Sequence, residues 1–325
     1  MADSIEEQLQ KYLTDAHSIE EQALAQLRRA PELAGDPELA SLYREHLAET
    51  ERQEALVRER LEAHDAKPSR LKDAVMKAGG TGFVLFARSQ PDTPGKLATH
   101  AFSYEHLELG AYELLMRIAD RAGDGATAEA ARRIRDEEQS MADRLAALFD
   151  RSVDASLREV DAADDPAAKL PKYLADAHAL EAQAVQLLER GPKIGGHPEI
   201  AAAYSDHLEE SRGHTQLVEG RLAAVGAGPS AIKDAALRMG GLNWGGFFQA
   251  QPDTPGKLAA FVFAFEHLEI GGYEQLRRVA ERAGDAETVA VADRILGEER
   301  GAAGRLASLW DRAAEASLEA QGLTG

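Results

Sequence analysis

The sequence contains no cysteine, which excludes disulfide bonds, iron–sulfur clusters and cysteine-ligated zinc sites. No stretch approaches the roughly 18 consecutive apolar residues of a membrane-spanning helix. Lys and Arg form no run, and with a formal net charge of −19 the surface should repel nucleic acid and anionic membranes. The first residues resemble no export signal. We therefore expect a cytoplasmic protein without a nucleic-acid or membrane partner.

β-branched residues are also sparse, whereas Leu, Ala, Glu and Arg dominate. This composition favours helix almost everywhere and predicts an all-α fold. The motifs G-x-S-x-G, G-x-x-x-x-G-K-[ST] and G-x-G-x-x-G do not occur in a strand–helix context. The hydrolase, nucleotide and dinucleotide chemistries that use such strands are therefore not indicated.

The chain of 325 residues consists of two tandem copies of one sequence repeat. Residues 11–157 align with residues 172–318 without a gap, at a constant offset of 161, and QPDTPGKLA occurs at both 90–98 and 251–259. A period of this length is the size of a domain and too long for a solenoid repeat. We expect a first domain over 1–157, a polar linker over 158–171 and a second domain over 172–325. The two units should pack as a pseudo-dimer, and further homo-oligomerisation is left open.

Each unit should contain four long helices. In the first unit we expect them at 4–29, from Asp36-Pro37 onward, from Thr93-Pro94 onward, and along a last apolar stripe from Ile134 to Leu148. A short helix is expected near 69–77, followed by a glycine- and aromatic-rich segment. Four long helices with one long connection describe a four-helix bundle with a crossover.

Carboxylates lie on the stripe of each helix that should face the core. Burying them is prohibitive unless their charge is compensated. The core-stripe carboxylates are Glu20, Glu49, Glu105 and Glu138, then Glu181, Glu210, Glu266 and Glu299. Polar neighbours one helical turn away are His17, His46, Gln53 and Glu108, then His178, His207, His214 and Glu269.

Carboxylates from four helices, with imidazoles one turn away, are how a four-helix bundle builds a two-metal site. Oxygen ligands with some imidazole suit iron or manganese. A single Glu or His near a core stripe is more often a boundary residue or a satisfied hydrogen-bond partner. The full set of four is harder to explain that way, although duplication means that the second unit is not independent support. His17, His46, His178 and His207 are left open as ligands, partners of ligands or structural residues.

Several motifs resemble one family in the same order along both units. They are DAHSIEEQ and DAHALEAQ on the first helix, HLAET and HLEESRGH on the second, YEHLELGAY and FEHLEIGGY on the third, and an acidic doublet at 137–138 and 298–299. The chain resembles a tandem copy of the YciE/YciF-type (DUF892) stress protein family.

This resemblance implies two tandem ferritin-like four-helix bundles, a di-iron or di-manganese carboxylate centre and a link to stress response. By position, the first-unit ligands would be Glu20, Glu49, Glu105, Glu108 and Glu138, with Gln53 as a weaker ligand. The second-unit ligands would be Glu181, Glu210, His214, Glu266, Glu269 and Glu299.

The two units depart from a typical ferritin-like pattern at one place. A typical fourth helix carries E-x-x-H, but Met141 and Ala302 stand where that His would be. Two functions therefore remain open, with iron storage in a shell as a weaker third. One is a metal-dependent redox protein, with an oxidase or ferroxidase-like activity, in which Glu49 and Glu105 bridge two irons. The other is a non-catalytic stress or scaffold protein with a degenerate or structural metal site.

Overall fold

The structure is a computed structural model that describes residues 4–69, 92–160, 165–229 and 254–323. Contacts between residues divide the chain into two compact units, Met1–Val160 and Asp161–Gly325. This division lies inside the segment 158–171 that the sequence predicts as a linker, although helical structure already resumes at Pro166. The linker bounds stay a prediction. The short helix expected near 69–77 and the two aromatic-rich segments lie almost wholly outside the described residues.

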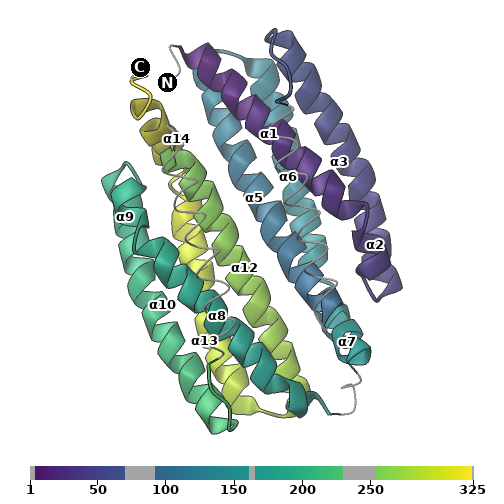
Figure 1. The fold of residues 1–325 in the computed structure, drawn as a ribbon. Coiled ribbons are helices and arrows are strands. Elements are labelled where there is room, and N and C mark those ends of the chain that lie inside the picture. Colours follow the sequence, from purple (N-terminus) through teal and green to yellow (C-terminus); the bar gives the residue numbers. More distant parts are fainter. Residues whose placement is uncertain (1–3, 70–91, 161–164, 230–253, 324–325) are drawn as a thin grey trace. The chain divides into compact units, whose positions relative to one another are not determined.

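The first unit is built from long antiparallel helices that lie side by side (Figure 1). Its helices are α1 (Ile5–Leu27), α2 (Ala30–Leu33), α3 (Pro37–Ala63), α5 (Thr93–Ala122), α6 (Gly125–Ala146) and α7 (Phe149–Glu159). Helix α1 packs on α3 and α5, while α6 packs on α5 and α3. These four long helices therefore enclose one core.

The second unit repeats this arrangement. Its elements are η1 (Pro166–Lys169), α8 (Leu170–Leu188), α9 (Gly191–Ile194), α10 (Pro198–Ala224), α12 (Thr254–Ala283), α13 (Ala286–Ala307) and α14 (Trp310–Glu319). Helix α8 packs on α10 and α12, and α13 packs on α12 and α10. The expected all-α fold of two tandem helical bundles is confirmed.

Capping residues set several helix ends, and α3 begins at the predicted Asp36-Pro37. The side chain of Asp36 accepts hydrogen bonds from the backbone N–H groups of Glu38 and Leu39, and Pro37 occupies the first turn of α3. Helix α5 ends at Gly123, whose φ of 74° is left-handed and favours glycine. Asp124 then caps α6. The turn between α5 and α6 is therefore fixed by local chemistry.

Each unit has a further helix that the sequence did not lead us to predict. The expected fourth helix, extending to Leu148, ends at Ala146, and α7 begins again at Phe149. The Phe149 ring packs edge-on against Phe102 of α5, with ring centroids 5.3 Å apart. The Ser156 hydroxyl accepts a hydrogen bond of 2.7 Å from the backbone N–H of Gly95. The first N–H groups of a helix have no partner within that helix. Helix α7 therefore provides a hydrogen-bond acceptor for one of these N–H groups at the start of α5.

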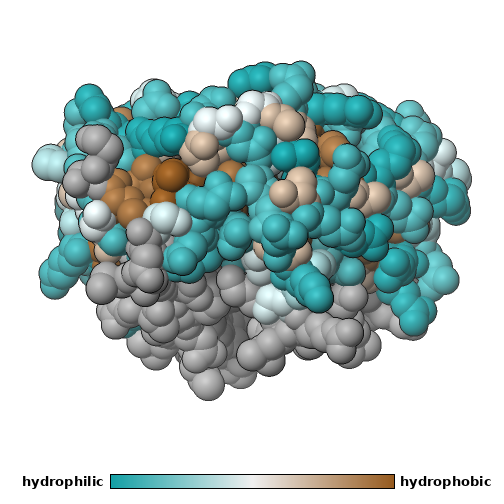
Figure 2. Space-filling view, turned by 90° about the horizontal axis from the view of Figure 1, so that it is seen from above, coloured by the Kyte–Doolittle hydropathy of each residue, from teal (hydrophilic) through white to brown (hydrophobic). Residues whose placement is uncertain are grey.

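The interior of each unit carries several buried acids. On the face drawn in Figure 2, hydrophilic residues cover most of the coloured surface, with one small hydrophobic area. Among the described residues, no helix is both long and apolar enough to cross a membrane. The buried acids are the unusual feature, because Glu is almost never fully buried unless it is paired.

Candidate metal centre

The first unit gathers four potential ligands in the middle of its core. His46 comes from α3, Glu105 and Glu108 from α5, and Glu138 from α6. One ligand atom from each lies within 4.8 Å of the others. None of the four residues is more than 3 % exposed. The spacing of three residues between Glu105 and Glu108 places both carboxylates on one face of α5.

His46 is oriented by a carboxylate on its outer side. Its Nδ1 lies 3.3 Å from Glu49 Oε2, and its Nε2 faces inward, 3.1 Å from Glu105 Oε2 and 3.6 Å from Glu138 Oε2. A carboxylate that holds one ring nitrogen while the other faces a cluster is the usual arrangement around a metal-binding His.

Glu49 therefore does not lie where the core-stripe pattern places it. Its side chain is 27 % exposed and points toward the outer nitrogen of His46, with Arg144 Nη1 at 3.9 Å. The contact with His46, followed by Arg144, lowers the pKa of the Glu49 carboxyl. Helix α3 turns His46 into the core instead, so the imidazole takes the inward position that the core-stripe pattern predicts for Glu49.

The inner carboxylates lack the partners that burial demands. Neither oxygen of Glu108 or Glu138 has a hydrogen-bond partner among the described residues. Burial, then repulsion by neighbouring acids, raises the pKa values of Glu108 and Glu138 well above their usual range. Burial also acts on Glu105, but the charge of His46 prevails and lowers its pKa. Without a cation, part of this cluster must hold protons at neutral pH.

Glu20 reaches the same region from α1. The Tyr112 hydroxyl of α5 donates a hydrogen bond to its Oε1, and Oε2 has no partner among the described residues. Burial raises the pKa of Glu20 to about 8, although Tyr112 and His46 act against this. The carboxylates predicted on the first, third and fourth long helices are thus all buried.

Gln53 lies one turn beyond Glu49 on α3. Its amide nitrogen donates to Glu137 Oε2 at 3.1 Å, while its buried Oε1 has no partner in the described part of the chain. The amide oxygen is therefore available, but it is a neutral and weak ligand.

The second unit reproduces the first cluster with His207, Glu266, Glu269 and Glu299. His207 Nε2 lies 2.6 Å from Glu266 Oε2 and 3.5 Å from Glu299 Oε2, and its Nδ1 lies 3.1 Å from Glu210. Glu210 is 29 % exposed and, like Glu49, stands outside the cluster. Burial would lower the pKa of His207, but Glu266 and the contact with Glu210 raise it to about 11.

A second group in this unit is formed by Glu181, His214 and Glu299. His214 Nδ1 lies 3.4 Å from Glu181 Oε1 and 3.0 Å from Glu299 Oε1. Its Nε2 lies 2.7 Å from Glu298. All three members are fully buried. The two groups of the second unit therefore meet at Glu299.

Of the four histidines whose role the sequence leaves open, His17 and His178 lie outside these clusters. His17 Nε2 is 3.1 Å from Glu54, and with Glu21 these residues form a smaller group between α1 and α3. In the second unit His178 instead contacts Glu219 at 3.2 Å. The sequence pattern gave no means of separating these two residues from His46 and His207, since all four lie near core stripes.

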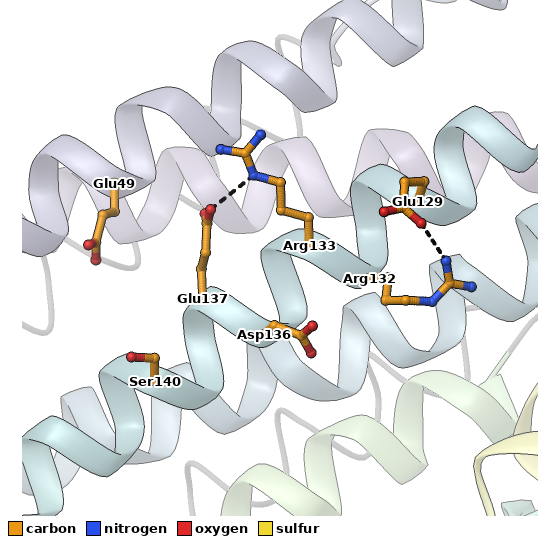
Figure 3. A pocket seen from close by; sticks show the side chains of 7 residues that line it. All are labelled: Glu49, Glu129, Arg132, Arg133, Asp136, Glu137 and Ser140. Carbon is orange, nitrogen blue, oxygen red and sulfur yellow. Dashed lines mark hydrogen bonds and ion pairs between the residues drawn. The ribbon is translucent and has the colours of Figure 1, made fainter.

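A charged surface hollow of about 470 Å³ lies beside the first cluster. Figure 3 shows its lining, with Glu49 from α3 and the other side chains from α6, among them Arg133 paired with Glu137. Glu49 and Glu137 also contact His46 and Gln53, respectively. The hollow is therefore connected to the buried cluster through the Glu49–His46 pair, and a second pair connects it to Gln53.

The donor set fits a transition metal of intermediate hardness. Carboxylate oxygens and imidazole nitrogens suit iron and manganese, and several of these atoms are buried without other partners. A cation would remove the mutual repulsion of the acids and displace their protons.

Comparison with known families agrees with this division of the chain. No solved structure matches the chain. The family model described as "Domain of unknown function (DUF892)" matches residues 4–158 and again residues 168–319. The two matches together span nearly the whole sequence, so the chain belongs to the DUF892 family and carries two tandem copies of its domain.

Proposed function

We propose that each unit is a ferritin-like bundle that binds iron or manganese in its buried cluster, and that the bound metal serves redox chemistry linked to oxidative stress. The observation that carries this proposal is the set of buried carboxylate oxygens without partners at Glu108 and Glu138, repeated at Glu269 and Glu299. Unpaired buried charge is costly, and a cation is the group that these donors fit.

In the first unit, Glu105, Glu108, Glu138 and the Nε2 atom of His46 would hold the metal, with Glu20 beside them. In the second unit the corresponding holders are Glu181, His207, His214, Glu266, Glu269 and Glu299. Bound iron would supply one-electron redox chemistry toward dioxygen or peroxide. This assignment leaves out three of the predicted ligands. Gln53 is one, and the other two are Glu49 and Glu210, to which it gives the role of positioning His46 and His207.

The chain's own groups prepare the site for such an ion. Glu49 and Glu210 each hold the outer nitrogen of a histidine, so that the inner nitrogen faces the acids. Tyr112 donates to Glu20, and Tyr273 donates to Glu181 at 2.5 Å, which fixes each carboxylate and directs its second oxygen elsewhere. Complete burial excludes water and strengthens every charge interaction in the site.

The test is metal content followed by reaction with oxygen. The full chain should retain iron or manganese after purification, and the metal-free chain should take up oxygen when Fe(II) is added. The double variant Glu138→Ala, Glu299→Ala should lose both properties. Glu129→Ala, a highly exposed position on the same helix as Glu138, is the matched control and should keep them. A wild-type chain that binds neither metal would remove this proposal.

A non-catalytic role is the second candidate, and one feature favours it. Met141 and Ala302 are buried where a typical ferritin-like fourth helix would supply His. A site with fewer imidazoles can hold a metal for stability without activating oxygen. Under this proposal, metal binds and stabilises the chain, but Fe(II) addition produces no oxygen uptake beyond that of free iron.

A further inference from the structure

The two buried centres differ at only one of six paired positions. With the offset of 161 residues, the five Glu and His pairs are identical in type, but Gln53 of the first unit stands where the second unit has His214. The identical pairs are Glu20 with Glu181, His46 with His207, Glu105 with Glu266, Glu108 with Glu269, and Glu138 with Glu299. Any difference in the number of metal ions that the two centres bind must therefore arise from this position or from the residues that surround the centres.

His214 completes a second ligand group in the second unit. Its Nε2 lies 2.7 Å from Glu298, which leaves Nδ1 facing Glu181 and Glu299. Glu181 Oε2 and Glu299 Oε2 have no hydrogen-bond partner in the described part of the chain. The carboxylate–imidazole contact is the support that metal-binding histidines use.

Glu299 is placed between the two groups. Its Oε1 lies 3.0 Å from His214 Nδ1, and its Oε2 lies 3.5 Å from His207 Nε2. Each oxygen of one carboxylate therefore faces a different imidazole. This is the geometry of a carboxylate that can serve two cations at once.

The first unit has only half of this arrangement. Glu138 Oε2 faces His46 at 3.6 Å, but no imidazole stands at the position of Gln53. The amide nitrogen of Gln53 is used by Glu137, so only its neutral oxygen is left for a cation. Iron favours imidazole more than an amide oxygen at such a position.

We propose that the two units load unequally, the second with two cations that share Glu299 and the first with one tightly bound cation, giving three per chain. This inference rests on the proposed metal binding and concerns its stoichiometry. Replacing a ligand should weaken binding at least as much as the ~10–100-fold that altering a ligand's supporting partner costs. The second position of the first unit therefore stays unfilled at concentrations that saturate the other three.

The experiment titrates the metal-free full chain with Fe(II) under anaerobic conditions and counts tightly bound iron after dialysis. Excess Mg²⁺ is present so that exposed carboxylates do not retain iron. The wild-type chain should hold three ions, His214→Gln should hold two, and Gln53→His should hold four. The double variant Gln53→His, His214→Gln should return to three.

The small group of His17, Glu21 and Glu54 provides the matched control. The second unit has Ala182 and Thr215 at the positions of Glu21 and Glu54, so Glu54→Thr makes the first unit resemble the second there. This variant should still hold three ions. A fall to two would place the third ion at His17 and overturn the inference.

The outcomes separate this inference from the proposed function. A wild-type chain without bound iron contradicts both. Two or four ions in the wild type, or three ions in His214→Gln, contradict unequal loading while leaving metal binding intact. Gln53→His adds a ligand rather than removing one, so its gain of an ion tests the inference even if His214→Gln fails to fold.

Discussion

The two units keep the same buried acids but surround them differently. In both, a tyrosine holds the carboxylate of the first helix and a partly exposed glutamate holds a histidine. At the periphery, Tyr104 is replaced by Phe265 and His64 by Val225. The Tyr–Glu and Glu–His pairs therefore occur together in both units, whereas the contacts around them differ within the same fold.

Within the buried centres, only one paired position differs between the units: Gln53 in the first and His214 in the second. Gln53 and His214 each contact a glutamate on the fourth long helix, at 3.1 Å and 2.7 Å. Burial would lower the pKa of His214, but its contacts with Glu181 and Glu299 raise it to about 10. The second centre can thus carry one more positive charge than the first when no metal is bound.

The largest expected effect is on stability: removing an unpaired buried acid should stabilise the metal-free chain and destabilise the metal-bound chain. Glu269→Met should stabilise the metal-free second unit by about 1–4 kcal/mol, because an apolar side chain removes the cost of an uncompensated carboxyl. In the metal-saturated chain the same variant should be less stable than wild type, because it has lost a ligand. Urea unfolding can follow this through tryptophan fluorescence, since Trp310 is buried in the second unit.

Glu108→Met is the matched change in the first unit, where hydrogen exchange along α5 supplies the readout. With one tightly bound cation instead of two, the metal-dependent loss should be smaller than for Glu269→Met. Destabilisation by either variant in the metal-free chain would mean that the carboxyl is paired there and needs no cation.

The next largest effect concerns the tyrosines that hold the first-helix acids. Tyr273→Phe removes a buried donor to Glu181 and should cost about 1–3 kcal/mol, because the acid keeps its burial but loses its partner. Tyr112→Phe should act alike on Glu20. Metal affinity should fall in both, by ~10–100-fold, if these acids are ligands. Calorimetric titration measures the affinity, and an unchanged value would place Glu20 and Glu181 outside the metal centre.

The sequence predicts the fold well because its signals are local. Asp36-Pro37 begins α3 and Asp124 begins α6, each through hydrogen bonds to backbone groups two or three residues away. The break after Ala146 carries no Gly or Pro. Ala147 keeps helical dihedral angles, with φ −64° and ψ −18°, and only Leu148 departs from them, at φ −102° and ψ 7°. Helix α7 therefore has no sequence signal at its start and was missed.

The site is less predictable because it depends on how each helix is rotated. His46 and Glu49 are three residues apart, so both lie near the same stripe. Packing decides between them, leaving the His46 side chain 1 % exposed and the Glu49 side chain 27 % exposed. Glu20, Glu105 and Glu138 could be found from periodicity, since apolar residues flank each of them on the buried face.

A smaller effect is expected where one unit has a hydroxyl and the other does not. The Tyr104 hydroxyl donates to the backbone carbonyl of Ile19 at 3.0 Å, linking α5 to α1, and Phe265 makes no such bond. Tyr104→Phe should therefore cost the first unit about 0.5–1.5 kcal/mol and leave metal binding unchanged. Hydrogen exchange in α1 measures the loss. A change in metal affinity would show that this contact also positions Glu20.

The smallest effect is a pH-dependent contact found only in the first unit. His64, which follows α3, has Nε2 2.6 Å from Asp124 Oδ2, and its Nδ1 contacts Glu6. Partial burial acts to lower the pKa of His64, but the contacts with Asp124 and Glu6 prevail and raise it above 6.5. Val225 occupies the equivalent place after α10.

Because the folded-state pKa of His64 is raised, its contribution is fully present below about pH 6.5 and is lost as pH rises through the folded-state value. His64→Val should therefore cost the first unit about 0.2–1 kcal/mol near pH 6, a small value because solvent screens this partly exposed pair. The cost should be smaller at pH 9, because fewer His64 side chains are protonated there. Hydrogen exchange in α6 at both pH values measures the difference. An equal cost at both pH values would assign the effect to packing. In that case the reciprocal variant Val225→His should leave hydrogen exchange in α13 without an added dependence on pH.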